Sequence, residues 1–171
     1  GFNPKLATEL GADGRALSLA VSLNSVAVAA GTLAATAIAK RVGAGNLIYL
    51  GFALMAGGVL AAALAPGLWL LFVAQVVIGL AQGVGGPILM GLSIRYVSEN
   101  ERATAMGLHQ TVYAFGMFGG PAISGVLAAW LGIRPMLGIT AGVILLLGIL
   151  LMRVFTQHVP DERNAQVADA G

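Results

Sequence analysis

Residues 42–94 read VGAGNLIYLGFALMAGGVLAAALAPGLWLLFVAQVVIGLAQGVGGPILMGLSI, a run of 53 residues in which no side chain is charged. A membrane-spanning helix needs about 20 mostly apolar residues, because about 30 Å of hydrocarbon is crossed at about 1.5 Å per residue. The run is therefore long enough for two spans and a turn. Ala65-Pro66-Gly67 lies near its middle, and proline and glycine favour turns. This stretch predicts helices over 46–64 and 67–94.

The sequence on either side of this run predicts three further spans. Residues 16–39, 103–133 and 135–152 also carry no charge, which predicts helices over 15–39, 102–130 and 134–154. The whole chain of 171 residues is 58% hydrophobic and 9% charged, whereas soluble domains are about a quarter charged. Backbone groups in lipid must be satisfied within their own segment, and the alternating pattern of a porin strand is missing. We therefore expect an all-α, polytopic transmembrane helix bundle.

Basic residues give the five spans an orientation, because lysine and arginine collect on the cytoplasmic side of a membrane. If the loop between the first two spans lies inside, six basic residues lie in the cytoplasm, namely Lys40, Arg41, Arg95, Arg102, Arg153 and Arg163. Three lie outside, namely Lys5, Arg15 and Arg134. We expect a multi-pass protein of the inner cell membrane. Residues 1–14 then form an external loop with the remnant of a truncated helix, 15–155 the bundle, and 156–171 a disordered cytoplasmic tail.

Several classes of function are disfavoured by composition. The chain has no cysteine, which excludes disulfides, thiolate chemistry and cysteine-ligated metals. Its basic residues form no stripe of the kind that binds nucleic acid. No span holds paired carboxylates, a multi-histidine cluster or a Ser/His/Asp set, so we expect neither an enzyme nor a bound metal or cofactor.

Uncharged polar residues gather on three of the five spans. At about 100° per residue, they form a strip on each of the helices predicted over 15–39, 67–94 and 102–130, whereas the other two spans have few. Polar side chains in lipid turn toward protein or water, so these three helices are expected to line an interior while the other two face lipid. The candidates for contact with a solute are Ser22, Ser25, Gln75, Gln82, His109, Gln110 and Tyr113.

A plainer interpretation stands beside this one. Small and hydroxyl residues four apart also mediate close helix packing, and serine or threonine can bond back to its own helix. Burying Gln75 or Gln82 without a partner costs more, which leaves both packing and cavity lining open for them. His109 is the centre of the densest polar group, yet a lone histidine is more often a satisfied hydrogen-bonding group than a proton carrier. No span contains Asp or Glu, so an intramembrane carboxylate relay is missing.

The loop after the first span resembles a motif of the major facilitator superfamily. That motif reads G-x-x-x-D-R-x-G-R-R, and residues 36–45 here read T-A-I-A-K-R-V-G-A-G. Arg41 and Gly43 match, whereas Lys40 replaces the acidic residue. The resemblance implies a loop that couples conformational states, with the charge relay of the family's acidic residue lost.

The fourth span carries a second resemblance. Gly107, Gly116, Gly120-Pro121 and Ser124-Gly125 are similar to the glycine-proline motif of the fifth helix of antiporters in this superfamily, with serine for one glycine. Glycines let neighbouring backbones approach, and proline removes a backbone hydrogen bond and bends the helix. The residues expected to serve conformational change are Lys40, Arg41, Gly43, Gly116, Gly120 and Pro121.

The superfamily's two six-helix halves suggest which part of the fold is present. The resemblance covers nearly the whole chain, and the altered loop motif and polar tail favour the C-terminal half, with the five spans as helices 8 to 12. It implies a secondary transporter of a small organic solute that works by alternating access, with the lipid bilayer and the missing N-terminal half as partners. Whether transport is coupled to a proton or another cation is left open by the sequence. The alternatives are the first half of a drug/proton antiporter and a non-transporting membrane scaffold or sensor.

Overall fold

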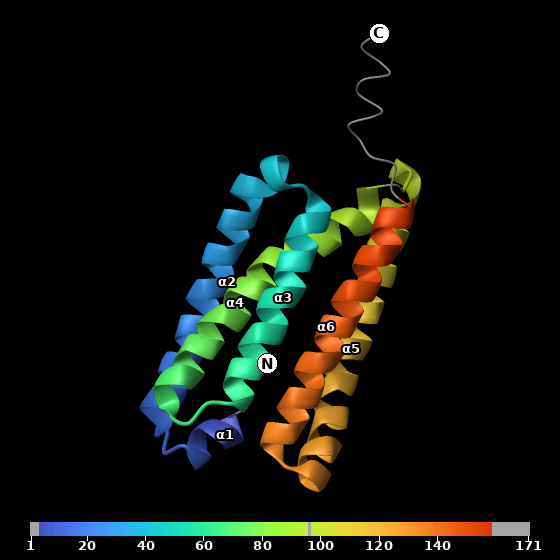
Figure 1. Ribbon diagram of the computed structural model, residues 1–171. Coiled ribbons are helices and arrows are strands. Elements are labelled where there is room, and N and C mark those ends of the chain that lie inside the picture. The colour runs from blue at the N-terminus through green and yellow to red at the C-terminus, as the bar shows by residue number, and fades with distance from the viewer. Residues whose placement is uncertain (1–3, 96, 159–171) are drawn as a thin grey trace.

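The computed structural model describes residues 4–95 and 97–158, and over them the protein is helical (Figure 1). The elements are α1 Pro4–Glu9, α2 Gly14–Val42, α3 Ala44–Ala63, α4 Leu68–Arg95, the 3-10 turn η1 Glu99–Glu101, α5 Arg102–Leu131 and α6 Ile133–His158. Helices α2 to α6 contain five segments that are long and apolar enough to cross a membrane. The predicted all-α bundle of five spans is confirmed. Residues 1–3 and 159–171, which include most of the predicted tail, lie outside the described part.

The segment before the first span, expected as an external loop with the remnant of a helix, is helical over part of its length. Residues 4–9 form α1, and Leu6 and Ala7 pack against the turn between α3 and α4, where Leu6 is 1% exposed. Asp13 then begins α2, because its Oδ1 accepts a hydrogen bond of 2.8 Å from the backbone N–H of Ala16. Apolar contact and a helix cap thus fix this segment against one end of the bundle.

Two helix pairs are joined through a single glycine each. Gly43 connects α2 to α3 and Gly132 connects α5 to α6, with φ of 82° and 87°. Their N–H groups donate to Ala39 and Ala128 and close the preceding helices. A side chain disfavours positive φ, which explains glycine at both positions. We name the two ends of the bundle the Gly43 end and the Gly132 end after these links, which lie at opposite ends (Figure 1).

Helices α2 and α4 run parallel and meet at backbone distance. A Cβ atom built on Gly31 would lie 2.6 Å from the carbonyl oxygen of Leu80, and one built on Gly79 would lie 2.5 Å from that of Asn24. A Cβ atom on Gly83 would collide with the carbonyl oxygen of Val28. These glycines make the close approach possible, as small residues do between membrane helices.

Two interhelical hydrogen bonds reinforce the contact. The amide of Asn24 donates to the backbone oxygen of Gln75 at 2.9 Å. The hydroxyl of Thr32 shares its hydrogen between the backbone oxygen of Gly83 at 3.2 Å and that of Val28 in its own helix at 3.0 Å. The donors are eight residues apart on α2 and the acceptors eight apart on α4. The bonds therefore hold the two helices in one register.

The remaining helices pack outward from this pair. Helix α3 lies against the other side of α4, where Gly58 meets Ile78, and α6 lies against α3, where Gly148 meets Phe52. Helix α5 contacts α6 and the end of α4 only weakly, and none of its described residues is buried. Figure 1 shows α4 approaching α5 at the Gly43 end and diverging from it toward the Gly132 end.

Arg134 ties α6 to the end of α3. Its Nη2 donates to the carbonyl oxygen of Ala65 at 2.8 Å and its Nη1 to that of Ala63 at 3.3 Å. The last carbonyls of a helix lack partners within the helix and carry partial negative charge. The guanidinium group therefore stabilises the α3 terminus and joins two turns at the Gly132 end.

We predict that Gly83→Ala destabilises the protein. The new Cβ would meet backbone atoms of Val28 and Thr32, which can move only if α2 and α4 separate. The expected loss in the free energy of unfolding is about 1–3 kcal/mol, measured as a lower thermal midpoint in detergent. Gly86→Ala on the same helix is the control, because a Cβ there meets nothing within 4 Å. Equal midpoints for the two variants would contradict the close packing.

We also predict that Arg134→Met lowers the stability. The variant keeps the aliphatic bulk but leaves the carbonyl groups of Ala63 and Ala65 without the charged donor, a loss of about 1.5–3 kcal/mol. Arg102→Met is the matched control, because Arg102 makes only an exposed ion pair of 3.9 Å with Glu99 and such pairs contribute about 0–1 kcal/mol. Thermal unfolding of both variants in detergent tests the difference. If Arg134→Met lowers the thermal midpoint no more than Arg102→Met does, the hydrogen bonds of Arg134 do not stabilise the protein.

Candidate functional site

The hydroxyl groups of α2 bond mainly to their own helix. Ser18 donates to Gly14, Ser25 to Val21 and Thr36 to Leu33, at 3.0, 3.0 and 2.8 Å. Each hydroxyl thus has a backbone acceptor within one turn, as expected for serine and threonine in membrane helices. These bonds fit the plainer interpretation of the strip, in which the hydroxyls need no solute.

The candidate strip of α2 lies away from α4. Ala20, Ala27 and Ala35 are buried, and they lie on the same side as Gly31, which contacts α4. Ser22 and Ser25 are exposed. The α2 side chains that make the interhelical bonds are instead Asn24 and Thr32, neither of which is among the solute candidates.

The two glutamines of α4 differ in their surroundings. Gln75 is 2% exposed and its Oε1 has no hydrogen-bond partner among the described residues, whereas Gln82, two turns later, is exposed. A buried amide oxygen without a partner costs about 1–3 kcal/mol. Gln75 is thus a buried acceptor, whereas Gln82 lies on the surface of this chain.

His109 on α5 is held by a residue of α4. Its Nδ1 lies 2.8 Å from the hydroxyl oxygen of Ser93, and both residues are half-buried. Ser93 is not among the residues expected to contact a solute. The pair lies toward the Gly43 end, where α4 and α5 approach each other (Figure 1).

The rest of the α5 strip is open. Gln110 is exposed and Tyr113 is 63% exposed. Because His109, Tyr113, Gly116 and Gly120 share one strip, the strip starts at the α4 contact and continues where α4 has diverged. The structure therefore brings His109 together with α4 but leaves Gln110 and Tyr113 without a neighbouring helix on that side.

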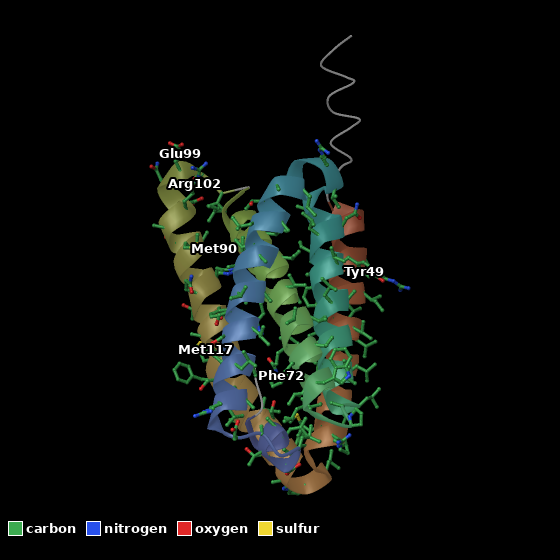
Figure 2. The ribbon with its side chains drawn as sticks, turned by 90° about the vertical axis from the view of Figure 1, so that its left-hand side faces the viewer. Tyr49, Phe72, Met90, Glu99, Arg102 and Met117 are labelled. Carbon is green, nitrogen blue, oxygen red and sulfur yellow. The ribbon has the colours of Figure 1, made fainter. Side chains whose placement is uncertain are left out.

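The structure explains some of the residues that are expected to serve conformational change but not others. Gly43 is explained by its positive φ between α2 and α3, and Arg41 is exposed. The side chain of Lys40 lies outside the described part. Figure 2 shows other side chains at this end, including Glu99 and Arg102 near the start of α5.

The glycines of the glycine-proline motif of α5 meet no neighbouring helix in the part of the chain that the structure describes. A Cβ atom on Gly116 or Gly120 would find nothing within 4 Å, and α5 continues through Pro121. Pro87 likewise lies inside α4, although it is not among the residues expected to serve conformational change. The close glycine packing occurs instead between α2 and α4, and the four-residue spacing of Gly79 and Gly83 is its signal in the sequence.

The candidate residues offer hydrogen-bonding groups. Across the described residues, no three His, Cys, Asp or Glu come close enough to hold a metal ion. The polar candidates supply amides, hydroxyls and one imidazole from three helices. Such groups form directional contacts without a fixed charge.

Comparison with known proteins identifies the fold. Two solved structures of a peptide transporter POT mutant are similar to this chain. The one in complex with alafosfalin is 23% identical with a TM-score of 0.72, covering 86% of this chain and 31% of that chain. The one in complex with sulfate is 20% identical with a TM-score of 0.73, covering 94% and 35%. This chain thus spans about a third of the length of those transporters. No curated protein gives a significant match.

The family model of the Major Facilitator Superfamily matches residues 1–170. This family consists of transporters rather than enzymes, and the structural neighbours are multi-pass membrane transporters. The expectations of a membrane protein, of a transporter fold and of a non-enzymatic role are thereby confirmed. Its loop motif, its five helices and this match together place the chain in the Major Facilitator Superfamily.

Proposed function

We propose that this chain is part of a secondary transporter that moves a small organic solute by alternating access. Helices α2, α4 and α5 form one wall of the path in this proposal, while α3 and α6 face lipid. The observation that carries it is the family match combined with the polar side chains of these three helices. The proposed wall residues are Ser22, Ser25, Gln75, Gln82, His109, Gln110 and Tyr113.

The packing of α5 supports this wall. None of its described residues is buried, although it carries histidine and glutamine side by side and tyrosine one turn later. A helix with polar side chains gains stability in lipid only when they face protein or water. Its exposed strip is therefore assigned to the path, and the remaining length of the parent chain supplies the opposite wall.

The chemistry of the wall favours a neutral or amphipathic solute. Helices α2 to α6 contain no Asp or Glu, and their basic residues stand near the helix ends. A strongly ionic solute would have to find its counter-charge elsewhere in the parent chain, as would a coupling proton or cation. The neutral and amphipathic members of a solute panel are thus the first to test.

The half and its orientation are part of the proposal. The altered motif at Lys40 to Gly45 favours helices 8 to 12 of the C-terminal half, with the first half of a drug/proton antiporter as the alternative. The Gly43 end carries the larger share of basic residues and is assigned to the cytoplasm of the inner membrane. Cysteine accessibility of Arg41→Cys and Arg15→Cys variants from either side tests this, since the chain has no other cysteine.

Transport is tested with the protein expressed from its complete gene and reconstituted in proteoliposomes. The panel holds labelled sugars, zwitterionic dipeptides and lipophilic amines, with and without a proton gradient. Saturable, gradient-dependent accumulation of one class supports the proposal. Absence of any flux in protein that is folded and correctly inserted would favour a scaffold or sensor instead.

We predict that Gln82→Ala, Gln110→Ala and Tyr113→Phe each lower transport. Each variant removes a hydrogen-bonding group from the proposed wall, which corresponds to a fall of about 3- to 10-fold in kcat/KM. Tyr49→Phe on α3 is the matched control, because Tyr49 is also exposed but lies on a helix assigned to lipid (Figure 2). Unchanged transport in all three variants would exclude the wall assignment.

We predict that Gln75→Leu separates transport from stability. Leucine fills a similar volume and removes the buried oxygen that has no partner among the described residues, so the thermal midpoint should not fall. Transport should fall because the acceptor is lost. Asn24→Leu is the comparison, since it removes a hydrogen bond of 2.9 Å and should cost about 1 kcal/mol of stability. A destabilised Gln75→Leu variant with full transport would assign Gln75 to the fold alone.

A further inference from the structure

The hydroxyl group of Ser93 contacts His109 and also a backbone oxygen of its own helix. The hydroxyl oxygen of Ser93 lies 2.8 Å from His109 Nδ1 and 2.9 Å from the backbone oxygen of Leu89, one turn earlier on α4. One hydroxyl thus has two partners, one on its own helix and one on α5. The chemical nature of these partners decides where the hydrogens lie.

A serine hydroxyl has one hydrogen to donate and two lone pairs with which to accept. The oxygen of Leu89 can only accept, and the geometry assigns the hydroxyl hydrogen to it. The lone pairs of Ser93 then face Nδ1, and this contact is a hydrogen bond only if Nδ1 donates. In a neutral imidazole one nitrogen carries hydrogen and the other is an acceptor, which leaves Nε2 with the free lone pair.

We propose that Ser93 is a positioning residue that holds His109 in the Nδ1–H form and presents Nε2 as an acceptor for an N–H or O–H group of the transported solute. The contact with a solute rests on the proposed function, whereas the tautomer of His109 does not. The tautomer follows from the backbone oxygen of Leu89, the hydroxyl of Ser93 and the ring of His109. The solute class is accordingly narrowed to molecules that carry an N–H or O–H donor.

The surroundings of the pair agree with this role. His109 is half-buried, so its ring is partly shielded from competing water, whereas Tyr113 one turn later is open. A fixed acceptor beside an open stretch of the same strip gives a donor-bearing solute one defined contact. Fixing the ring before the solute arrives lowers the conformational entropy lost on binding.

The tautomer is tested by 15N NMR on the chain with labelled imidazole nitrogens, in lipid nanodiscs at alkaline pH, where imidazole is neutral. The chain has two histidines, so His158→Gln leaves only the His109 signal. We expect a protonated Nδ1 and a bare Nε2. Ser93→Ala should shift the signals toward the other tautomer, and Ser93→Thr, which keeps a hydroxyl, should restore them. A protonated Nε2 in the unchanged chain, or signals that Ser93→Ala does not alter, would overturn the proposal.

The role toward the solute is tested with the complete protein and the solute class found in the flux panel. Ser93→Ala should raise KM about tenfold with little change in kcat, and Ser93→Thr should recover most of it. A solute analogue with its N–H or O–H methylated should bind equally to both forms. An unchanged KM in Ser93→Ala overturns the acceptor role while transport itself stands. If no flux exists, the acceptor role falls with the proposed function and the NMR result alone decides the tautomer.

Discussion

Backbone contact between α2 and α4 is the constraint on which the bundle depends. In lipid there is little hydrophobic gain from bringing two apolar helices together, so close packing and hydrogen bonds have to supply the attraction. Gly31, Gly79 and Gly83 allow the approach, and Asn24 and Thr32 add bonds at two levels. With that pair fixed, α4 presents its other side to α3, and α3 in turn packs against α6.

Much of this fold could be predicted from the sequence because charge marks the limits of each span. Residues 42–94 have no charge and one Pro-Gly turn, which located two helices and the link between them. The short helix α1 was missed, since six residues beside a proline and a glycine carry too little periodicity to indicate one. Its order comes from Leu6 packing on a distant turn, a tertiary contact that no local pattern contains.

The candidate site was less predictable, because polarity and packing use different faces of the same helix. On α2 the serines mark one side, whereas alanines and Gly31 on another side contact α4. Periodicity detected the serines but gave no reason to prefer the small residues. The pairing of Ser93 with His109 depends on how α4 tilts toward α5, and the tilt is set by contacts remote in sequence. The positions of the remaining candidates along the proposed wall stay a prediction.

The link at Gly132 has a mechanical consequence for α5. Gly132 is the single residue between α5 and α6, so these two helix ends must stay close together. At the same place Arg134 joins α6 to the terminus of α3. The other end of α5 follows a longer connection that includes η1. A tilt of α5 about this link would displace its Arg102 end most, close to the contact of His109 with Ser93.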